Sequence, residues 1–415
     1  MRIWIVNYYN GTPASMWNPR YLVLAKYFME KGWDVTLFNA SYLDDALADE
    51  FRPRELFLRK KYGEYDFVHV KAPRYKGNGF GRMKSLFCFA WTIKKHCNEF
   101  DRPDVILHNI HTPFDYPIVW TAKKLHAKYV AEAWDAWPDV FAHLGMVSRS
   151  NPAFKFFELI EKKLYQNADQ IVFTILGMKE HIRQKGWSTE TGGKIDLNSV
   201  HYINNGIDLE QFDKDRECWP RADEDLLDPK TLKIVYLGSV HRANHVHTLI
   251  DAAKLLQNIG IYRFFIYGDG KDREELEKKV IDEGINNVVF KEKRIPLCEC
   301  AWVVSQATVN VMTYQKGFGY MGVSSGKMFQ YLAAGKPILC NVNIAYDNVI
   351  EDNNLGIAQD IESPEGFAEM IRKLAEQPRA SYDAMCERVR ETAKQFDYKV
   401  LAAQEIQVIE KALKA

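Results

Sequence analysis

The sequence predicts an α/β protein built from two doubly wound domains, each a mainly parallel sheet with helices on both faces. Short runs rich in β-branched and aromatic residues alternate with amphipathic helical segments along the chain, which is the pattern of such sheets. The chain has 415 residues, enough for two domains of ordinary size. A charged, turn-rich segment at 206–229 is typical of a linker. We therefore expect domains at 1–205 and 230–394, and a C-terminal helix at 395–415 that packs on one of them.

The individual elements follow from the spacing of apolar residues. In the first domain the expected strands are 3–7, 35–38, 67–70, 105–108, 129–132, 170–174 and 200–203. In the second domain they are 233–237, 262–267, 288–290, 309–312, 337–340 and 355–358. The clearest helices are 19–31, 246–258, 273–283 and 327–334. The C-terminal helix is expected to bury the face formed by Phe396, Val400, Leu401, Ile406, Ile409 and Leu413.

Composition argues against several classes of protein. Lys plus Arg and Asp plus Glu number 55 each, so no net charge attracts nucleic acid. No stretch of about 18 apolar residues is present, which argues against a membrane span. The N-terminus, MRIWIVNYYN, has the character of a first strand and not of a signal peptide. The 7 cysteines are scattered without repeated pair spacing, so we expect reduced thiols and a cytoplasmic location. Cys298 and Cys300 could suggest a metal site, but no second Cys or His pair has zinc-finger spacing, so we favour a structural role.

The most informative stretch is 323–339, VSSGKMFQYLAAGKPIL, which predicts a helix that begins at a capped turn. Ser324 or Ser325 can cap its first turn, and Gly335 ends it. The start of a helix presents unpaired N–H groups and about half a positive charge, so it stabilises a phosphate. Lys327 adds a full charge within the first turn. The alternative is an ordinary capped helix of the core.

Two further glycine-containing loops follow predicted strands of the same domain. Gly238 lets a backbone approach closely, and Arg242 can bind a diphosphate with two parallel hydrogen bonds. The next loop is a tight turn in which Gly268 precedes Asp269. Because the carboxyl ends of parallel strands meet at one edge of a sheet, we expect all three loops to converge there. Each loop alone is common turn chemistry, whereas three in this order predict a diphosphate site.

With these loops, the chain resembles the GT-B glycosyltransferases, in particular the retaining, nucleotide-sugar-dependent group called family four. Within that group it is most similar to bacterial enzymes that build O-antigen, capsule and exopolysaccharide, including fucosamine transferases. Besides the three loops, the resemblance is carried by 19–38, 103–111, 131–140, 162–182, 203–212 and 353–357.

The resemblance implies two Rossmann-like domains that face one another across a cleft. It also implies a hexosyl- or N-acetylhexosaminyltransferase that moves a sugar from a nucleotide diphosphate, UDP above all, to a lipid-linked saccharide. The enzyme would act in surface-polysaccharide assembly in the cytoplasm, peripherally at the inner membrane face. The nucleotide sugar is then a co-substrate, and the resemblance implies no metal and no other cofactor.

The resemblance also assigns residues to the donor. Family members carry two Glu residues on the diphosphate helix, the second of which holds the ribose hydroxyls; the matching positions here are Gly322 and Gln330. The Gln330 amide oxygen can accept one such hydrogen bond without charge assistance. Arg242 and Lys327 match basic residues that stabilise the leaving diphosphate. The implied donor-binding residues are Asn10, Gly11, Gly238, Arg242, Gly268, Asp269, Arg294, Val323, Ser324, Ser325, Lys327 and Gln330.

Catalysis is expected to involve AEAWDAWPDV, 131–140. Related enzymes have a Glu-x-Arg-Asp-x-Trp-Pro pattern here, and this chain has Trp134 in place of the Arg. Asp135, at a strand end, would orient the acceptor hydroxyl or stabilise positive charge on the sugar ring; the alternative is that it caps the following turn. The implied acceptor residues are Arg20, Glu132 and Trp134, and the implied catalytic residues are Asp135, Arg242 and Lys327.

Three other features each allow two interpretations. Asn10 and Gly11 either approach the donor or form a simple turn. The Asp-x-Asp patterns at 213–215 and 223–225 would suit a metal-dependent transferase, but they fall in the predicted linker, so we interpret them as solvated charges. Residues 71–95 hold 7 basic residues, no acidic residue and several large aromatics. They predict either contact with anionic lipid or an ordinary helix with solvated basic residues.

Other functions remain open at this level. A nucleotide-sugar epimerase or hydrolase also uses GT-B domains. A catalytically silent scaffold is suggested by Gly322, Gln330 and Trp134, which replace expected charged residues. An NAD-dependent dehydrogenase is disfavoured, because the first strand is followed by NYYNGT and not by the Gly-x-Gly-x-x-Gly turn that binds a pyrophosphate.

Overall fold

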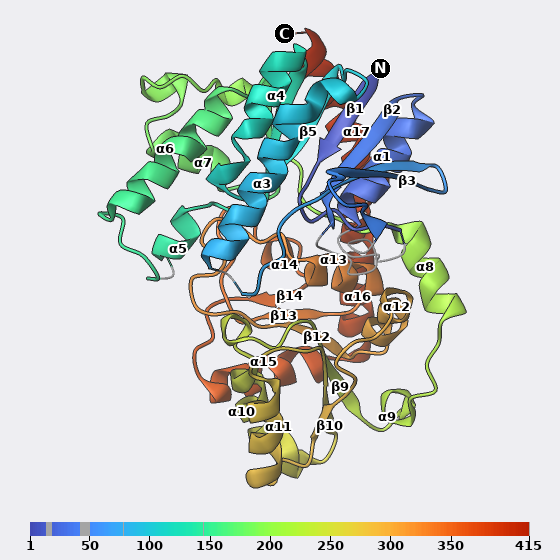
Figure 1. Ribbon diagram of the computed structural model, residues 1–415. Coiled ribbons are helices and arrows are strands. Elements are labelled where there is room, and N and C mark those ends of the chain that lie inside the picture. The colour runs from blue at the N-terminus through green and yellow to red at the C-terminus, as the bar shows by residue number, and fades with distance from the viewer. Residues whose placement is uncertain (14–18, 42–49, 78, 144, 415) are drawn as a thin grey trace. The chain divides into compact units, whose positions relative to one another are not determined.

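The chain folds into two compact units, each with its own sheet (Figure 1). The computed structural model describes residues 1–13, 19–41, 50–77, 79–143 and 145–414. The first unit comprises Met1–Asn204 and Leu401–Ala415, and the second comprises Asn205–Val400. The predicted linker, 206–229, therefore lies inside the second unit, where it carries the helices α8 (Leu209–Cys218) and α9 (Glu224–Leu227).

The first unit contains an eight-stranded sheet with the strand order β3-β4-β2-β1-β5-β6-β7-β8. All neighbours are parallel except β3 and β4, which are antiparallel. The strands are β1 (Arg2–Val6), β2 (Asp34–Ala40), β3 (Phe57–Tyr62), β4 (Tyr65–Val70), β5 (Val105–Ile110), β6 (Lys128–Ala133), β7 (Gln170–Phe173) and β8 (Val200–Tyr202). The helices of this unit are α1 (Arg20–Glu30), α3 (Phe80–His96), α4 (Pro117–Leu125), α5 (Asp139–His143), α6 (Pro152–Gln166), α7 (Met178–Gln184) and most of α17 (Tyr398–Lys414).

The second unit contains a six-stranded, fully parallel sheet with the order β11-β10-β9-β12-β13-β14. Its strands are β9 (Leu232–Leu237), β10 (Tyr262–Tyr267), β11 (Val288–Phe290), β12 (Val309–Met312), β13 (Ile338–Cys340) and β14 (Gly356–Ala358). Besides α8 and α9, its helices are α10 (Val246–Leu256), α11 (Arg273–Asp282), α12 (Leu297–Ser305), α13 (Gly326–Ala334), α14 (Val349–Asp352), α15 (Pro364–Ala375) and α16 (Arg379–Ala393). The strand order reverses between β9 and β12, and ligands bind at such a reversal in open α/β sheets.

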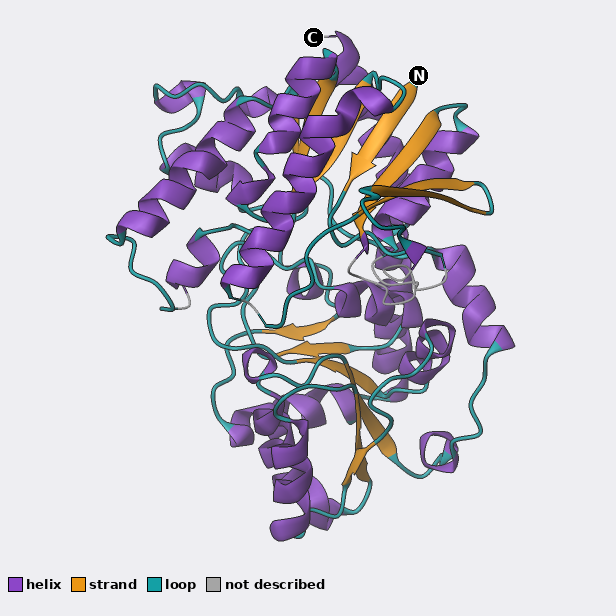
Figure 2. Cartoon of the chain, in the orientation of Figure 1, coloured by secondary structure: helices purple, strands orange, loops and turns teal. Residues whose placement is uncertain are grey.

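The predicted α/β class with two parallel-sheet domains is confirmed (Figure 2). Central strands such as β1 are almost fully buried, which explains their continuous apolar sequences. One strand, β3, was not predicted; half of its sequence, FLRKKY, is basic. It lies at the sheet edge and pairs on one side only, so it needs no apolar run. Among the described residues, no helix combines the length and apolarity needed to cross a membrane.

The C-terminal helix α17 packs on the first unit, but its buried face differs in part from the predicted one. Leu401 and Ile409 are buried as expected, whereas Val400 is 41% and Leu413 39% exposed. The buried face also contains a carboxylate, Glu405, at 0% exposure. A periodicity analysis that counts only apolar residues cannot place such a residue on the inner face.

Candidate functional site

In the second unit, glycines bring the loops after β9 and β10 into direct contact. A Cβ atom added to Gly268 would stand 1.7 Å from the Gly238 carbonyl oxygen, and one added to Gly270 would stand 1.9 Å from that of Val240. Any larger residue would separate the loops. The Val240 N–H also donates a hydrogen bond to the Asp269 carbonyl, at 2.8 Å. Only glycine therefore permits this backbone packing at the carboxyl edge of the sheet.

The third loop joins them through Lys327 in the first turn of α13. A Cβ on Gly238 would stand 2.9 Å from Lys327 Cδ, so the lysine side chain lies across the loop after β9. Its Nζ lies 4.7 Å from the ring centroid of Tyr236 and 4.8 Å from that of Tyr314, and 3.3 Å from the Tyr236 hydroxyl. No carboxylate of the described residues forms an ion pair with it. The structure thus brings the three loops together around an unpaired cation.

Burial changes the acidity of this lysine. Loss of hydration lowers the pKa of Lys327 from its ordinary value to about 8. The two aromatic faces stabilise the ammonium in part but carry no net charge. An anion bound at Nζ would supply the missing counter-charge and raise the pKa again. A desolvated cation without a partner, placed where strand ends converge, is typical of a binding site.

The start of α13 differs from the predicted capped turn. Ser325 is the N-cap residue but makes no side-chain capping hydrogen bond, and the Ser324 hydroxyl accepts one from Asn205 Nδ2 at 3.0 Å. Ser325 thus stands at the predicted N-cap position, but the predicted capping hydrogen bond to a serine side chain is absent from the described residues. The Val323 side chain is buried in the core, at 5% exposure. Further along α13, Gln330 Oε1 is buried and has no hydrogen-bond partner in the described part of the chain, so it remains able to accept one.

The other predicted donor residues lie at the surface of this unit. Arg242 begins the 3₁₀ helix η6 (Arg242–Asn244) after β9, and is exposed, without an ion pair to any described residue. Arg294 is exposed in the loop after β11. Asp269 is exposed too, and its carboxylate accepts a hydrogen bond from the Gly270 N–H at 2.9 Å. Arg242 and Arg294 are thus available to a ligand, whereas Asp269 serves its own turn.

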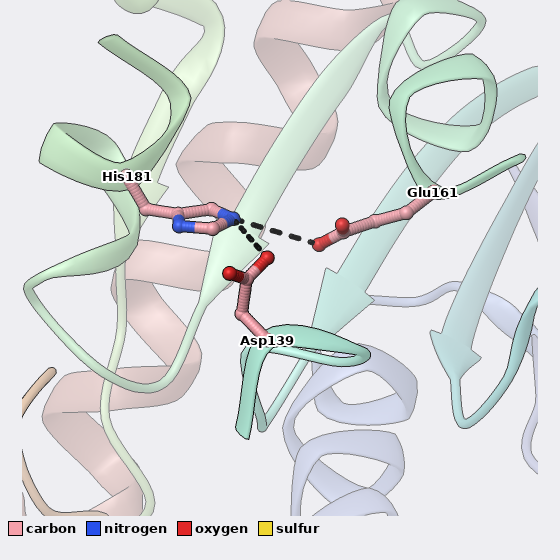
Figure 3. Close-up of side chains that lie close together, drawn as sticks. All are labelled: Asp139, Glu161 and His181. Carbon is pink, nitrogen blue, oxygen red and sulfur yellow. Dashed lines mark ion pairs between the residues drawn. The ribbon is translucent and has the colours of Figure 1, made fainter. Parts of the chain in front are cut away.

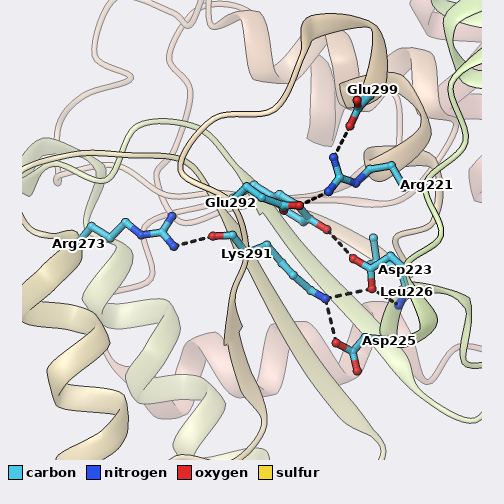
Figure 4. Close-up of polar contacts among 9 residues, drawn as sticks. Arg221, Asp223, Asp225, Leu226, Arg273, Lys291, Glu292 and Glu299 are labelled. Carbon is cyan, nitrogen blue, oxygen red and sulfur yellow. Dashed lines mark hydrogen bonds and ion pairs between the residues drawn. The ribbon is translucent and has the colours of Figure 1, made fainter.

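The charges of the predicted linker are not simply solvated. Lys291 Nζ lies 3.0 Å from Asp223 Oδ1 and 2.8 Å from Asp225 Oδ2 (Figure 4). Asp213 Oδ2 lies 2.5 Å from Arg390 Nη2. Our interpretation of both acidic patterns as solvated loop charges is therefore wrong, because basic side chains distant in sequence neutralise them.

These ion pairs hold the segment 219–225 against the loop that follows β11. Arg221 pairs with both Glu292 and Glu299 (Figure 4). The Glu292 carbonyl in turn accepts a hydrogen bond from the Gly268 N–H at 3.2 Å. The paired segment thus supports the backbone on which the second glycine loop rests.

In the first unit, the predicted acceptor residues form a buried cluster. Arg20 Nε donates to Glu132 Oε1 at 2.9 Å, and Nη1 donates to the Asn204 carbonyl at 2.8 Å. A second carboxylate, Glu405 from α17, lies 3.6 Å from Arg20 Nη2. The side chains of all three charged residues are 0% exposed. Arg20 and Glu132 therefore expose no side-chain atom to an acceptor, contrary to the prediction.

Trp134 connects this cluster to the strand end. Its Nε1–H donates to Glu132 Oε1 at 2.5 Å, and its ring stacks on Tyr21 with centroids 5.8 Å apart. Trp134 thus supplies an N–H to Glu132, while Arg20 supplies the positive charge.

One arginine faces two buried carboxylates, so the second carboxylate is held protonated. Burial raises the pKa of Glu405 to about 8, and the negative charge of Glu132 adds to this effect. At neutral pH the cluster therefore pairs one cation with one anion.

Asp135, Asn10 and Gly11 lie after the ends of β6 and β1. The Asp135 side chain is exposed by surface area, and no described residue donates a hydrogen bond to its carboxylate, so it does not cap the following turn. The surrounding strand-end loops still withdraw the carboxyl from water enough to raise its pKa above its ordinary value. Asn10 and Gly11 are buried. The Asn10 side-chain amide is buried and has no hydrogen-bond partner among the described residues. Buried polar groups normally have a partner, so this observation favours contact with the donor over a simple turn.

His111, which follows β5, is a candidate that the sequence analysis did not name. Its Nε2 lies 2.7 Å from Asn7 Oδ1, and that oxygen also accepts from the Tyr9 N–H at 2.9 Å. Nε2 is therefore the donor, and Nδ1 keeps its lone pair. The His111 ring lies 6.3 Å from the Trp134 ring. Burial lowers its pKa to about 3, so the ring is neutral at pH 7. The sequence signal was its place directly after a strand.

Asp139, Glu161 and His181 form a buried cluster whose ligand atoms all lie within 4.8 Å of one another (Figure 3). Residues of these types could hold a metal ion. Two cations already occupy the surroundings of Asp139, however: Lys185 Nζ is 2.8 Å from Oδ2 and Arg149 Nη1 is 2.7 Å from Oδ1. Burial lowers the pKa of His181 to about 4 and raises the pKa of Glu161 well above its usual range. We therefore interpret Asp139 as the charged member of the cluster, neutralised by Lys185 and Arg149.

The sequence matches two protein-family models, which divide at about the same place as the structure. Residues 20–211 match "Glycosyltransferase Family 4", and residues 231–377 match "Glycosyl transferases group 1". Together these models cover most of the chain. The protein belongs to the group 1 and family 4 superfamily of GT-B glycosyltransferases. It is a glycosyltransferase by family, and the matched regions include all the strand-end loops described above except the loop after β1.

Solved structures similar to this glycosyltransferase extend over its full length. Sucrose-phosphate synthase from Thermosynechococcus elongatus is 16% identical, with a TM-score of 0.72 over 99% of this chain and 98% of that one. Anabaena HepE in complex with UDP and glucose is 14% identical, with a TM-score of 0.68 over 99% of both chains. WaaG, a glycosyltransferase involved in lipopolysaccharide biosynthesis, is 14% identical, with a TM-score of 0.68 over 98% of this chain and 99% of that one. At these identities the likeness shows the GT-B fold. A comparison with curated protein sequences finds no match.

Proposed function

We propose that this glycosyltransferase transfers a sugar, with retention of configuration, from a UDP-linked donor to a lipid-linked saccharide in surface-polysaccharide assembly. The observation that carries the donor half is Lys327, a desolvated cation with no carboxylate partner among the described residues, at the start of α13. A diphosphate supplies the counter-charge that this site lacks.

Two structural neighbours support the choice of substrates. HepE has been solved with UDP and glucose bound, and WaaG takes part in lipopolysaccharide biosynthesis. A donor of the same chemistry would place its diphosphate at Lys327 and a ribose hydroxyl at Gln330 Oε1, which has no partner of its own. A lipid-linked acceptor would place the enzyme in the cytoplasm at the inner face of the membrane.

The residues have distinct parts in the proposed transfer. Lys327, with Arg242 and the uncapped N–H groups of α13, stabilises the charge that develops on the departing diphosphate. Departure leaves positive charge on the sugar ring, which in this scheme the Asp135 carboxylate would stabilise. The departing phosphate oxygen takes the proton of the acceptor hydroxyl, so no separate base is needed. Neither metal nor further cofactor has a part in this scheme.

The first test is thermal stabilisation by UDP, GDP, ADP and NAD, each with and without EDTA, because a ligand of the folded state raises its apparent stability. Stabilisation by UDP alone, unchanged by EDTA, supports the proposed donor and the absence of a metal. Stabilisation by none of them contradicts it.

The reaction itself is tested by product analysis with a UDP-sugar, with and without a polyprenyl-linked saccharide. Transfer with retention is expected. Free sugar or an epimer as the main product, in the presence of acceptor, would instead indicate the hydrolase or epimerase. Replacing Arg242 by Ala should lower both donor affinity and turnover, and unchanged kinetics would remove Arg242 from the site.

A further inference from the structure

Helix α3 of the first unit exposes aromatic side chains in one stripe. Phe80 is 77% exposed, Phe87 40% and Trp91 40%. Exposed Lys84 and Lys95 lie in the same stripe, since these five residues recur every three or four positions. The opposite side of the helix, which includes Leu86 and Phe89, is packed into the core. Helix α3 therefore has a second apolar face that the fold of the first unit does not use.

The neighbouring helix α4 extends this surface. Trp120 is 43% exposed, and its ring lies 6.2 Å from that of Trp91, which stacks on Phe87 at 5.6 Å. Lys94 Nζ lies 4.7 Å from the centroid of the Trp91 ring and 5.9 Å from that of Trp120. We call the surface formed by Phe80, Lys84, Phe87, Trp91, Lys94, Lys95 and Trp120 the aromatic–basic face. In Figure 1, α3 and α4 run side by side in the first unit.

Its charge is one-sided. Helices α3 and α4 contain no Asp or Glu, and their basic residues other than histidine are Arg82, Lys84, Lys94, Lys95, Lys123 and Lys124. Lys84, Lys95 and Lys124 are exposed and form no ion pair with the described residues. The whole chain, by contrast, has a net charge of zero. The positive charge of α3 and α4 is therefore not neutralised by any carboxylate on these two helices.

We propose that the aromatic–basic face docks on an anionic lipid bilayer, with Trp91, Trp120 and Phe87 entering the headgroup region and the lysines pairing with lipid phosphates. Tryptophan rings favour this region because they are both apolar and able to donate a hydrogen bond. Lysines bury their stems beside such rings and keep their ammonium groups at the phosphates. This proposal rests on the proposed function, because a lipid-linked acceptor lies in a membrane surface of this kind.

Charge complementarity favours a bilayer over a second copy of this chain. Two copies meeting through this face would oppose positive charge to positive charge, because neither helix supplies a carboxylate. A planar array of phosphates complements exposed lysines spaced along one helix.

The test is co-sedimentation of the full chain with vesicles of phosphatidylcholine alone or of equimolar phosphatidylcholine and phosphatidylglycerol. Binding to the anionic vesicles only, weakened by salt, is expected. Replacing Lys84 and Lys95 by Glu should weaken it at least about tenfold, since each lysine near the surface contributes several-fold. Replacing Trp91 and Trp120 by Ser should weaken it without changing its dependence on salt.

Matched controls lie in the second unit. Trp219→Ser and Lys278→Glu change an exposed tryptophan and an exposed lysine there, and should bind vesicles as the wild type does. Equal binding to both vesicle types, no binding to either, or unchanged binding by the Lys84/Lys95 variant would each overturn the proposal. Self-association that the Trp91/Trp120 variant abolishes would overturn it in favour of a second copy. UDP binding, measured in parallel, separates the two proposals. Vesicle binding without UDP binding would contradict the proposed function only. UDP binding without vesicle binding would contradict the docking of the aromatic–basic face only.

Discussion

Arg20 in the first unit and Lys327 in the second are both withdrawn from bulk water, but only one of them has a partner. Arg20 is fully buried, bonded to Glu132 and to a backbone carbonyl, with Glu405 close by. Lys327 rests between two tyrosine rings with no carboxylate among the described residues. The sequence predicted that each of these cations binds a substrate. Only Lys327 lacks a negatively charged partner in the described part of the chain, so only Lys327 can gain one from a bound substrate.

The difference shows how partners distinguish structural charge from binding charge. A buried cation that meets a carboxylate and a carbonyl is satisfied, and its removal leaves those groups stranded. A desolvated cation without a counter-charge costs stability in the free protein and regains it when an anion binds. The substitutions below separate these two cases.

The largest effect is expected from Arg20→Ala, which removes the cation paired with the buried Glu132 and the Arg20 donor of the Asn204 carbonyl. We expect the free energy of unfolding to fall by about 3–5 kcal/mol, measured by urea denaturation. Lys26→Ala, at an exposed position of the same helix, is the control and should change it by less than about 0.5 kcal/mol. A loss below about 1 kcal/mol for Arg20→Ala would show that the cluster does not hold the unit together.

Lys327→Met should have the opposite signature. Turnover of the UDP-sugar should fall about 10²–10³-fold, as when one preorganised electrostatic contact to the transition state is removed. The unfolding midpoint should stay the same or rise, because Met keeps the packing and removes an unpaired cation. Since the pKa of Lys327 is lowered to about 8, this gain should shrink as the pH rises from 8 toward 10.5, where the wild-type lysine is neutral when folded. A variant that is both inactive and strongly destabilised would make Lys327 structural.

A smaller effect is expected from Gln330→Glu. A carboxylate accepts a ribose hydroxyl hydrogen bond about 1 kcal/mol more strongly than an amide oxygen, so UDP affinity should rise about fivefold. Calorimetry with 2′,3′-dideoxy-UDP is the control, and this ligand should gain nothing. If both ligands gain equally, or neither gains, Gln330 does not contact the ribose.

The effect that depends most on pH is expected from Glu405→Gln. Burial raises the pKa of Glu405 to about 8 in the folded protein, so the folded state binds more protons than the unfolded state between pH 4.5 and 8. Wild-type stability therefore falls as the pH rises through this window. The glutamine variant should unfold at a higher temperature than the wild type at pH 9 and at about the same temperature at pH 5. Glu410→Gln, one turn further along α17 but not fully buried, should show no such crossover.

The fold was predictable because buried parallel strands require continuous apolar runs, and β10, β11 and β12 were predicted to the residue. Edge strand β3 was missed because basic residues make up half of it and it pairs only with its hairpin neighbour β4. The buried Glu405 was missed because its partner, Arg20, is distant in sequence. The donor loops could be predicted because glycines at strand ends leave a local signature. The buried pairing of Arg20 with Glu132, and the neutralisation of Asp223 by Lys291, could not, since those contacts exist only in the folded chain.

The most direct test of the contrast between the two cations is the binding of UDP and of uridine to wild-type protein and to Lys327→Met, measured by calorimetry at pH 7. If Lys327 is the unpaired charge that receives the diphosphate, the wild type binds UDP much more tightly than uridine, and the variant loses most of that preference. A Lys327→Met protein that keeps the wild-type preference for UDP would contradict this account.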